Sequence, residues 1–144
     1  MTTDKIIRVG VGVIVQNEKG EILLGRRNKT AKRDCTKLIH EWDWSLAGGG
    51  VEFGEELETC ATREVKEEAM LDIKNPTVFY CATDKNETCH WITVGLKSTA
   101  KGTPKSGEPD KYIEWEWFAL DNLPDKIFTP SFRVIQSFKQ RGTK

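Results

Sequence analysis

Seven glutamates lie between residues 52 and 68, in a chain whose Lys plus Arg and Asp plus Glu counts are both 22. On an α-helix, which turns by roughly 100° per residue, Glu64, Glu67 and Glu68 share about a third of the circumference and project from one side. Clustered carboxylates repel one another, and a hard divalent cation such as Mg²⁺ relieves this repulsion while it binds substrate phosphates. Arg63 can neutralise one acid, Glu67 or Glu55, but not the whole set. The alternative is a solvated acidic face, which charge composition alone favours.

Apolar residues recur at three- and four-residue steps through the same segment, which predicts a helix from Glu56 to about Ala69. They are Leu57, Cys60, Ala61, Val65 and Ala69. The glycine run Ala47-Gly48-Gly49-Gly50 precedes this helix. We expect the run to interrupt regular structure, because successive glycines carry a high entropic cost, and to let the backbone approach another group closely.

The remaining elements predict an α/β fold in which a mixed sheet lies between helices. Strands are expected at residues 6–15, 21–24, 42–46, 78–83, 90–96 and 114–118, with a turn at 17–20 and a break at Asn75-Pro76. Loops are expected at 26–37, a candidate substrate loop, and at 97–109. Thr129 and Pro130 read as the N-cap and first residue of a last helix with the apolar stripe Phe132, Ile135 and Phe138. The 144 residues fit a single domain, 1–144.

Composition argues against several classes of protein. The formal net charge is zero, so a nucleic-acid partner is not expected. The apolar N-terminal run is too short to span a membrane and no signal cleavage site follows it. The four cysteines (Cys35, Cys60, Cys81, Cys89) form no C-x-x-C pair and only His40 and His90 could complete a zinc site, so zinc is not expected. The histidines are interpreted as ordinary loop and strand residues, and the thiols as unpaired, which indicates a cytoplasmic protein.

The acidic segment also follows a known spacing. Gly49 is followed after five residues by Glu55 and, after seven more, by Arg63-Glu64-Val65-Lys66-Glu67-Glu68-Ala69-Met70-Leu71. This resembles the Nudix box, G-x5-E-x7-R-E-U-x-E-E-x-G-U with U aliphatic, and every charged position is filled. The departure is Met70, where the family usually has the glycine that lets the helix end tightly, so the local turn is in question.

The resemblance implies a Nudix α/β/α sandwich and a set of roles. Glu64 and Glu68 would be the principal Mg²⁺ ligands, with Mn²⁺ as a substitute, and Glu67 and the Gly48 carbonyl would contribute further contacts. Glu55 and Arg63 would form the pair that holds the glycine loop on the helix. Glu64, Glu67, Glu68 and Arg63 are therefore the expected catalytic set, and Gly49 is expected beside the substrate.

Weaker matches outside the box resemble the MutT-type nucleoside triphosphate pyrophosphatases, and most closely the dCTP pyrophosphatase-like group, whose members are commonly homodimers. These matches are residues 9–13, 23–27, 108–111 and 115–117. On this resemblance Arg27 would meet a phosphate, and Trp44 and Phe128 would lie near the base, although each aromatic could equally serve packing. Ile113 stands where the group often has a glutamate, so Asp110, Glu114 or Glu67 could be the general base.

The expected activity is Mg²⁺-dependent hydrolysis of a nucleoside triphosphate to the monophosphate and pyrophosphate, by attack of water at phosphorus. Two alternatives remain open at this point. One is hydrolysis of another nucleoside diphosphate-linked substrate, ADP-ribose or a nucleotide sugar, which would use the same box. The other is a non-catalytic nucleotide-sensing module, against which the complete acidic cluster argues. The expected partners are a nucleotide and, from the group resemblance, a second copy of the chain.

Overall fold

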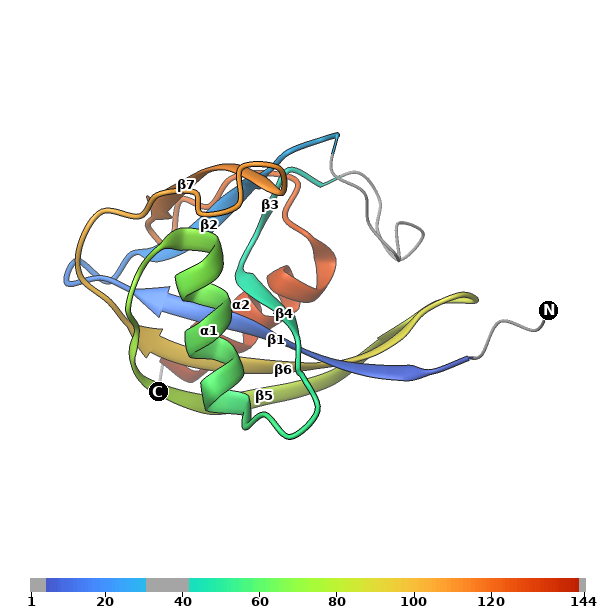
Figure 1. Cartoon of the computed structure of the whole chain (residues 1–144). Coiled ribbons are helices and arrows are strands. Elements are labelled where there is room, and N and C mark those ends of the chain that lie inside the picture. Colours follow the sequence, from blue (N-terminus) through green and yellow to red (C-terminus); the bar gives the residue numbers. More distant parts are fainter. Residues whose placement is uncertain (1–4, 31–41, 143–144) are drawn as a thin grey trace.

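Seven strands and two helices form the part of the chain that the computed structural model describes, residues 5–30 and 42–142 (Figure 1). In chain order they are β1 (Ile7–Gln16), β2 (Ile22–Arg27), β3 (Trp44–Ser45), β4 (Ala47–Gly50), α1 (Leu57–Ala69), β5 (Lys74–Lys85), β6 (His90–Thr99), β7 (Tyr112–Phe118) and α2 (Thr129–Gly142). Most of the predicted substrate loop, together with Cys35 and His40, lies outside the described residues.

The strands form one mixed sheet with β1 at its centre. Its order is β3-β2-β1-β6-β5, with β4 also paired to β1 and β7 paired to β2. The β1 and β6 strands run parallel, while β1 is antiparallel to β2 and β4. The predicted α/β class with a mixed sheet is confirmed.

Alternation along β1 divides the core into two layers. Val11, Val13 and Val15 pack into the cluster that contains the buried face of α1, whereas Ile14 packs with Val134 and Ile135 of α2. The two helices therefore cover opposite faces of the sheet (Figure 1), as the sequence pattern predicted. This arrangement leaves α1 free to present its acids along one side of the sheet.

The glycine run is a strand, so the prediction that it interrupts regular structure is wrong. Gly48 pairs with Gly12, and Gly49 with Val11, in the antiparallel ladder between β4 and β1. A side chain on Gly48 would collide with the Val11 carbonyl oxygen. The predicted close backbone approach is thus real, and the ladder hydrogen bonds offset the entropic cost of the glycines.

Other boundaries shift because pairing extends the strands. The expected break at Asn75-Pro76 is an irregularity inside β5, where the register with β6 shifts between Lys74 and Thr77 and Asn75 has φ 55°. The β5 strand is at the edge of the sheet, where a proline and a bulge are tolerated. The predicted loop at 97–109 starts later, because β6 continues to Thr99.

The last helix starts one residue earlier than predicted. The Phe128 carbonyl accepts the first helical hydrogen bond from the Phe132 N–H at 2.9 Å, so Phe128 takes the capping position and Pro130 is the second helical residue. Ile135 is buried, but Phe132 is 41% exposed and does not belong to the buried stripe. Neither helix of the described chain has the length and apolar character that crossing a membrane requires.

Candidate active site

Arg63 and Glu55 form a two-point ion pair between α1 and the segment that precedes it. The Arg63 Nε donates to Glu55 Oε2 at 2.7 Å, and Nη2 donates to Oε1 at 3.0 Å. Glu55 also accepts from the Glu52 N–H at 3.0 Å. The Arg63 hydrogen bonds, reinforced by this backbone N–H, lower the pKa of Glu55 to about 2. This is the pairing that the resemblance implied, and it fastens the loop after the glycine run to the helix.

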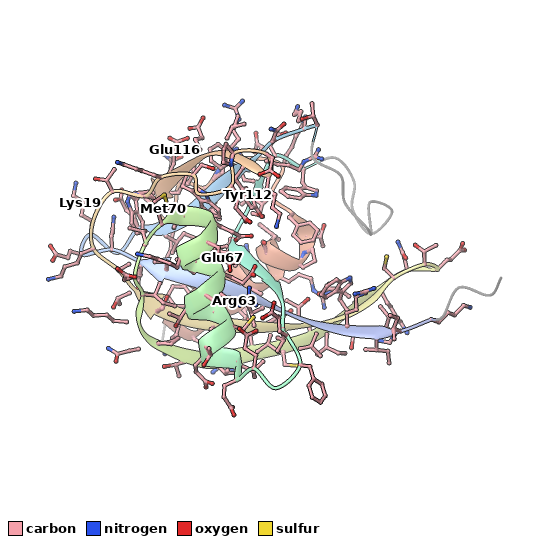
Figure 2. All side chains as sticks on the ribbon, in the orientation of Figure 1. Lys19, Arg63, Glu67, Met70, Tyr112 and Glu116 are labelled. Carbon is pink, nitrogen blue, oxygen red and sulfur yellow. The ribbon has the colours of Figure 1, made fainter. Side chains whose placement is uncertain are left out.

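The same guanidinium reaches two more acids of α1. Its Nη1 donates to Glu64 Oε1 at 2.6 Å and to Glu67 Oε1 at 3.2 Å, and Nη2 donates to the Gly50 carbonyl at 3.3 Å. Figure 2 shows Arg63 and Glu67 one turn apart on the face of α1 beside β4. Arg63 therefore connects the glycine run, the following loop and two of the three clustered glutamates.

Glu64 and Glu68 are buried against the glycine run. Their residues are 9% and 3% exposed, respectively. The Gly48 N–H donates to Glu68 Oε1 at 2.9 Å, and a side chain on Gly49 would collide with the Glu64 carboxylate. The glycines thus supply both a donor and the space that the two carboxylates need.

Burial raises the pKa of both carboxylates, and Glu68 has less compensating charge than Glu64. Desolvation raises the pKa of Glu64 and raises the pKa of Glu68 well above its usual value. Arg63 opposes the shift at Glu64, whereas the described residues offer Glu68 only the Gly48 N–H as a hydrogen-bond donor. A buried Glu68 carboxylate, with one backbone donor and the buried Glu64 beside it, forms a site that a further cation would stabilise.

The donor set fits Mg²⁺. Glu64, Glu67 and Glu68 offer hard carboxylate oxygens from one helix side, and the second oxygen of Glu68 has no hydrogen-bond partner in the described chain. Within residues 5–30 and 42–142, no three His, Cys, Asp or Glu side chains are already arranged around a common ion position. Arg63 instead holds Glu64 and Glu67. Metal roles for these acids and for the Gly48 carbonyl stay predictions.

The loop between β6 and β7 brings Glu108 and Lys111 to the buried acids. The loop docks on the end of α1, where the Gly107 N–H donates to the Glu68 carbonyl and the Lys105 N–H to the Ala69 carbonyl, both at 3.0 Å. Glu108 adds to the upward pKa shift of Glu68, and Lys111 opposes it. Lys111 Nζ lies 3.5 Å from Glu108 Oε1.

Sequence reasoning did not single out Glu108 or Lys111 as site residues. The resemblance included both in the 108–111 match, but only the docked loop brings them near the acids. A side chain on Gly107 would collide with the Glu67 carbonyl oxygen, so this glycine was the available signal that the loop packs tightly on the helix.

Of the two acids predicted as general bases, Glu114 lies away from the acidic helix. Glu114 is paired with Arg26 at 3.6 Å, and its neighbour Trp115 packs into the core on the α1 side. Because adjacent strand residues face opposite ways, Glu114 faces away from α1. A hydrogen bond to Glu114 raises the pKa of Glu116. Asp110 is exposed in the turn that precedes β7, between Glu108 and Lys111.

Arg27, Trp44 and Phe128, which were predicted to meet the substrate, each pack against an aromatic ring. Arg27 donates from Nε to the Trp42 carbonyl at 2.8 Å, and its guanidinium lies 4.9 Å from the Trp42 ring centre. The Phe128 ring also packs against Trp42, with the two ring centres 4.9 Å apart. Trp44 packs edge-on against Phe118, with their ring centres 5.0 Å apart. All three predicted residues are therefore engaged in packing, and their substrate roles stay predictions.

The cysteines differ from expectation at one position. Cys60 and Cys81 are free, as predicted, but Cys89 is disulfide-bonded. The prediction of unpaired thiols is wrong for Cys89, and the argument from thiols to a reducing compartment loses that residue. Burial raises the pKa of the Cys60 thiol to about 12, so this cysteine is a packing residue. His90 is a strand residue of β6, as predicted.

A glutamate-rich helix beside a glycine strand, on one face of a mixed sheet between helices, defines a class of hydrolase that acts on acid anhydrides. The chain matches the NUDIX domain model over residues 6–138 and belongs to the Nudix family. It is 26% identical to a MutT NUDIX hydrolase from Burkholderia pseudomallei, with a TM-score of 0.77 over 92% of this chain and 98% of that one. This agreement confirms the predicted fold and enzyme class.

Curated relatives have several activities. The chain is 32% identical to an ADP-ribose pyrophosphatase from Methanocaldococcus jannaschii, over 83% of this chain and 66% of that protein. It is 24% identical to an RNA pyrophosphohydrolase from Bartonella henselae, over 85% and 82% of the two chains. A 35% identical match to a NAD-capped RNA hydrolase from Stutzerimonas stutzeri covers 56% of this chain and 29% of that protein. The enzymes with these names all act on a phosphoanhydride bond, but the groups attached to that bond differ.

Proposed function

We propose that this Nudix hydrolase cleaves a nucleoside triphosphate to the nucleoside monophosphate and pyrophosphate, with Mg²⁺ held by Glu64, Glu67 and Glu68. The observation that carries the proposal is the convergence of two buried carboxylates, Glu64 and Glu68, on the glycine strand beside Arg63. A bound divalent ion would supply charge neutralisation at the phosphate oxygens and a lower pKa for an attacking water. Mn²⁺ would substitute for Mg²⁺ at the same oxygens.

Other residues of the chain orient the acids and contact the substrate phosphate. Arg63 holds Glu64 and Glu67 from one side and ties them to the preceding loop through Glu55. The Gly48 N–H fixes the orientation of Glu68. Lys111, on the docked loop and 3.5 Å from Glu108, is a cation that opposes the upward pKa shifts of Glu64 and Glu68, and we assign it to contact a substrate phosphate.

For the general base we favour Glu108 over the acids first considered. Glu108 is coupled electrostatically to Glu68, whereas Glu114 is paired with Arg26 and faces away from α1. A general base must reach the attacking water directly or through one water molecule. We favour Glu108 because its loop docks on the end of α1 through the Gly107 N–H, while Asp110 in the same loop and Glu67 stay candidates.

A second substrate class has specific support. The ADP-ribose pyrophosphatase relative matches 83% of this chain at 32% identity, so ADP-ribose is the main competitor to a triphosphate. The RNA pyrophosphohydrolase relative makes a 5′-triphosphorylated RNA end a third substrate to test. The balanced charge of the chain argues against extensive RNA contacts, because these need excess positive charge.

The test is a substrate panel with Mg²⁺, repeated with Mn²⁺ and with EDTA. It contains the canonical dNTPs and NTPs, ADP-ribose, GDP-sugars and a 5′-triphosphorylated RNA, and the products are separated as pyrophosphate, phosphate or sugar phosphate. We expect pyrophosphate and a nucleoside monophosphate as paired products. Turnover of ADP-ribose or RNA alone would replace the proposal, and turnover unaffected by EDTA would contradict the metal role.

Homodimerisation is part of the same proposal by family resemblance, and a cytoplasmic location is part of it because Cys60 and Cys81 are free thiols. Light scattering of the purified chain tests the first, and localisation of a tagged chain in its native cell tests the second. The disulfide at Cys89 makes the second test informative, because disulfides persist mainly in oxidising compartments.

A further inference from the structure

A buried hydrogen bond joins β3, which leads into the glycine strand, to the first residue of β7. Ser45 Oγ lies 2.9 Å from the Tyr112 hydroxyl oxygen, and the two residues are 2% and 5% exposed. Tyr112 belongs to the core cluster that contains the buried face of α1. The two hydroxyls therefore meet inside an apolar layer, and no part of the hydrolytic proposal uses them.

Tyr112 also closes the end of the loop between β6 and β7. Its carbonyl accepts a hydrogen bond from Ser106 Oγ at 2.5 Å, and its N–H donates to the Glu108 carbonyl at 3.0 Å. The Lys111 N–H donates to the same carbonyl at 2.8 Å. These bonds make residues 106–112 a compact turn that ends at Tyr112, so the place of the Tyr112 ring sets the place of the turn.

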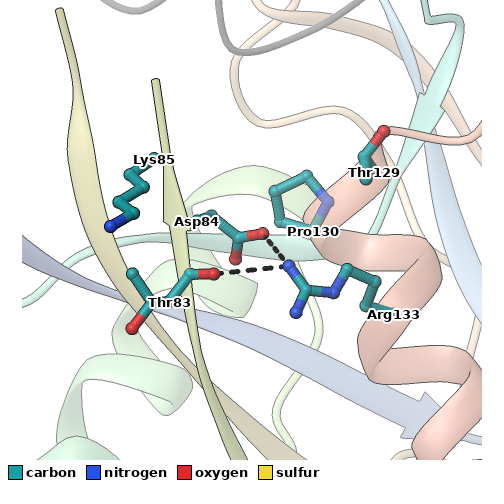
Figure 3. A pocket seen from close by; sticks show the side chains of 6 residues that line it. All are labelled: Thr83, Asp84, Lys85, Thr129, Pro130 and Arg133. Atoms are coloured by element: carbon teal, nitrogen blue, oxygen red, sulfur yellow. Dashed lines mark hydrogen bonds and ion pairs between the residues drawn. The ribbon is translucent and has the colours of Figure 1, made fainter. Parts of the chain in front are cut away.

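Ser45 is held from the opposite face of the sheet. It belongs to β3, which pairs with β2, and the N–H of the next residue, Leu46, donates to Ser131 Oγ at 3.1 Å. Ser131 lies in the first turn of α2. This end of α2 is fixed to the end of β5, because Arg133 Nη1 donates to Asp84 Oδ1 at 2.6 Å (Figure 3). The tyrosine hydroxyl is therefore bonded to a firmly held point of the sheet.

The two segments that this hydrogen bond joins both hold Glu68. The Gly48 N–H donates to the Glu68 carboxylate at 2.9 Å, and Gly48 follows Ser45 by three residues. The Gly107 N–H donates to the Glu68 carbonyl at 3.0 Å from within the turn that Tyr112 closes. The contacts form a closed ring, so a shift of the turn changes its position relative to the Glu68 carboxylate.

Stability alone does not account for a hydroxyl pair at this place. A buried hydrogen bond between neutral groups adds little net stability, because both groups give up bonds to water, and apolar groups of similar shape can replace both partners at almost no cost. A hydrogen bond does, however, weaken steeply away from its preferred distance and angle. It therefore fixes the relative position of two segments more sharply than an apolar contact does.

We propose that the hydrogen bond between Ser45 and Tyr112 positions the docked loop on the end of α1. Through the loop it sets where Glu108 and Lys111 lie relative to Glu68. Ser45 and Tyr112 are thus positioning residues that act without touching the substrate. A displacement of about 1 Å at a reacting group can lower a rate by about 100-fold, so a remote hydroxyl pair is able to control kcat. The inference rests on the proposed function for the roles of Glu108 and Lys111.

The test compares Tyr112→Phe, Ser45→Ala and the double variant. Each single change leaves one hydroxyl buried without its partner, whereas the double change removes both. The Tm in EDTA should therefore fall in each single variant and recover in the double variant. The matched control is Ser98→Ala, which removes a buried serine hydroxyl that donates to the Ile14 carbonyl of β1 at 2.9 Å.

Two readouts report on position. The first is amide hydrogen exchange in EDTA at Lys105 and Gly107, whose N–H groups dock the loop on α1. We expect exchange about 10-fold faster in the double variant than in Ser98→Ala, although the double variant has the higher Tm. The second is steady-state kinetics with the best substrate of the panel. We expect kcat to fall by about 10-fold and KM to change by less than about 2-fold in all three variants.

Recovery of both Tm and kcat in the double variant would assign the pair a purely structural role and overturn the proposal. Unchanged exchange at Gly107 in the double variant, or an equal loss of kcat in Ser98→Ala, would also overturn it. If the protein turns over no substrate of the panel, the proposed function fails. The exchange measurement then decides alone whether the hydroxyl pair positions the loop.

Discussion

The Glu55 carboxylate accepts hydrogen bonds from two Arg63 donors, at 2.7 Å and 3.0 Å, and is thereby fixed to α1 although it belongs to the preceding loop. Arg63 uses its remaining nitrogen to hold Glu64 and Glu67. The position of the loop and the orientation of the acids are consequently set by one side chain. Since a paired arginine and carboxylate depend on the charge of both partners, this coupling depends on pH.

Glu55→Gln should lower the Tm at neutral pH, and this decrease should disappear in acid. The folded pKa of Glu55 is lowered from 4.5 to about 2, so its contribution is complete above pH 4.5 and disappears as the pH falls through about 2. The measurement is the difference in Tm between the unmodified protein and Glu55→Gln from pH 7 to pH 2. We expect a constant difference above pH 5 that shrinks below it. Glu58→Gln, at an exposed position in the first turn of α1, is the control. A difference in Tm for Glu55→Gln that does not change with pH would refute the ion pair.

Glu68→Gln should remove activity without unfolding the protein. The amide is nearly isosteric and still accepts a hydrogen bond from the Gly48 N–H, but it cannot supply the charge that a divalent ion needs. We expect kcat to fall by at least about 100-fold with Mg²⁺. Because the buried charge is removed, Tm in EDTA at pH 8 should rise or stay unchanged. Glu58→Gln should keep full activity, and retained turnover in Glu68→Gln would contradict the metal role.

Local patterns in the sequence predicted α1 and its acids, because helix periodicity and box spacing depend on residues close together in the chain. They did not predict β4, since its ladder with β1 joins Gly48 to Gly12, far apart in sequence. The approach of Glu108 to Glu68 is equally non-local, because it depends on where the loop before β7 docks. The disulfide at Cys89 could not be predicted from cysteine spacing.

Three parallel substitutions compare Glu108 with Asp110 and Glu114 as the general base. If Glu108 orients the attacking water, Glu108→Gln should lower kcat by about 100-fold and change KM little, because proton transfer affects the transition state more than binding. Asp110→Asn and Glu114→Gln are matched controls and should stay near the unmodified rate. The readout is steady-state kinetics with the best substrate of the panel, accompanied by Tm. A larger loss in either control would transfer the role to that acid.

Met70 ends α1 in the left-handed conformation, at φ 57° and ψ 37°, with its N–H donating to the Lys66 carbonyl at 3.1 Å. The tight turn that the family usually builds with glycine is therefore kept, with a side chain that this conformation disfavours by about 1–2 kcal/mol. Met70→Gly should relieve this cost, while glycine adds entropy to the unfolded chain, so we expect a net gain of about 1 kcal/mol and a rise in Tm of about 3 °C.

The control for that substitution is Met70→Ala, which keeps the Cβ atom and should gain nothing. Activity should be unchanged in both variants, because Met70 is 51% exposed and none of its hydrogen bonds involves the clustered acids. Thermal unfolding and steady-state kinetics are the two measurements. A lower Tm for Met70→Gly would mean that packing of Met70 against the Gly107 loop outweighs backbone strain. Reduced activity at unchanged Tm would instead mean that the docking of this loop, and with it Glu108, depends on the Met70 side chain.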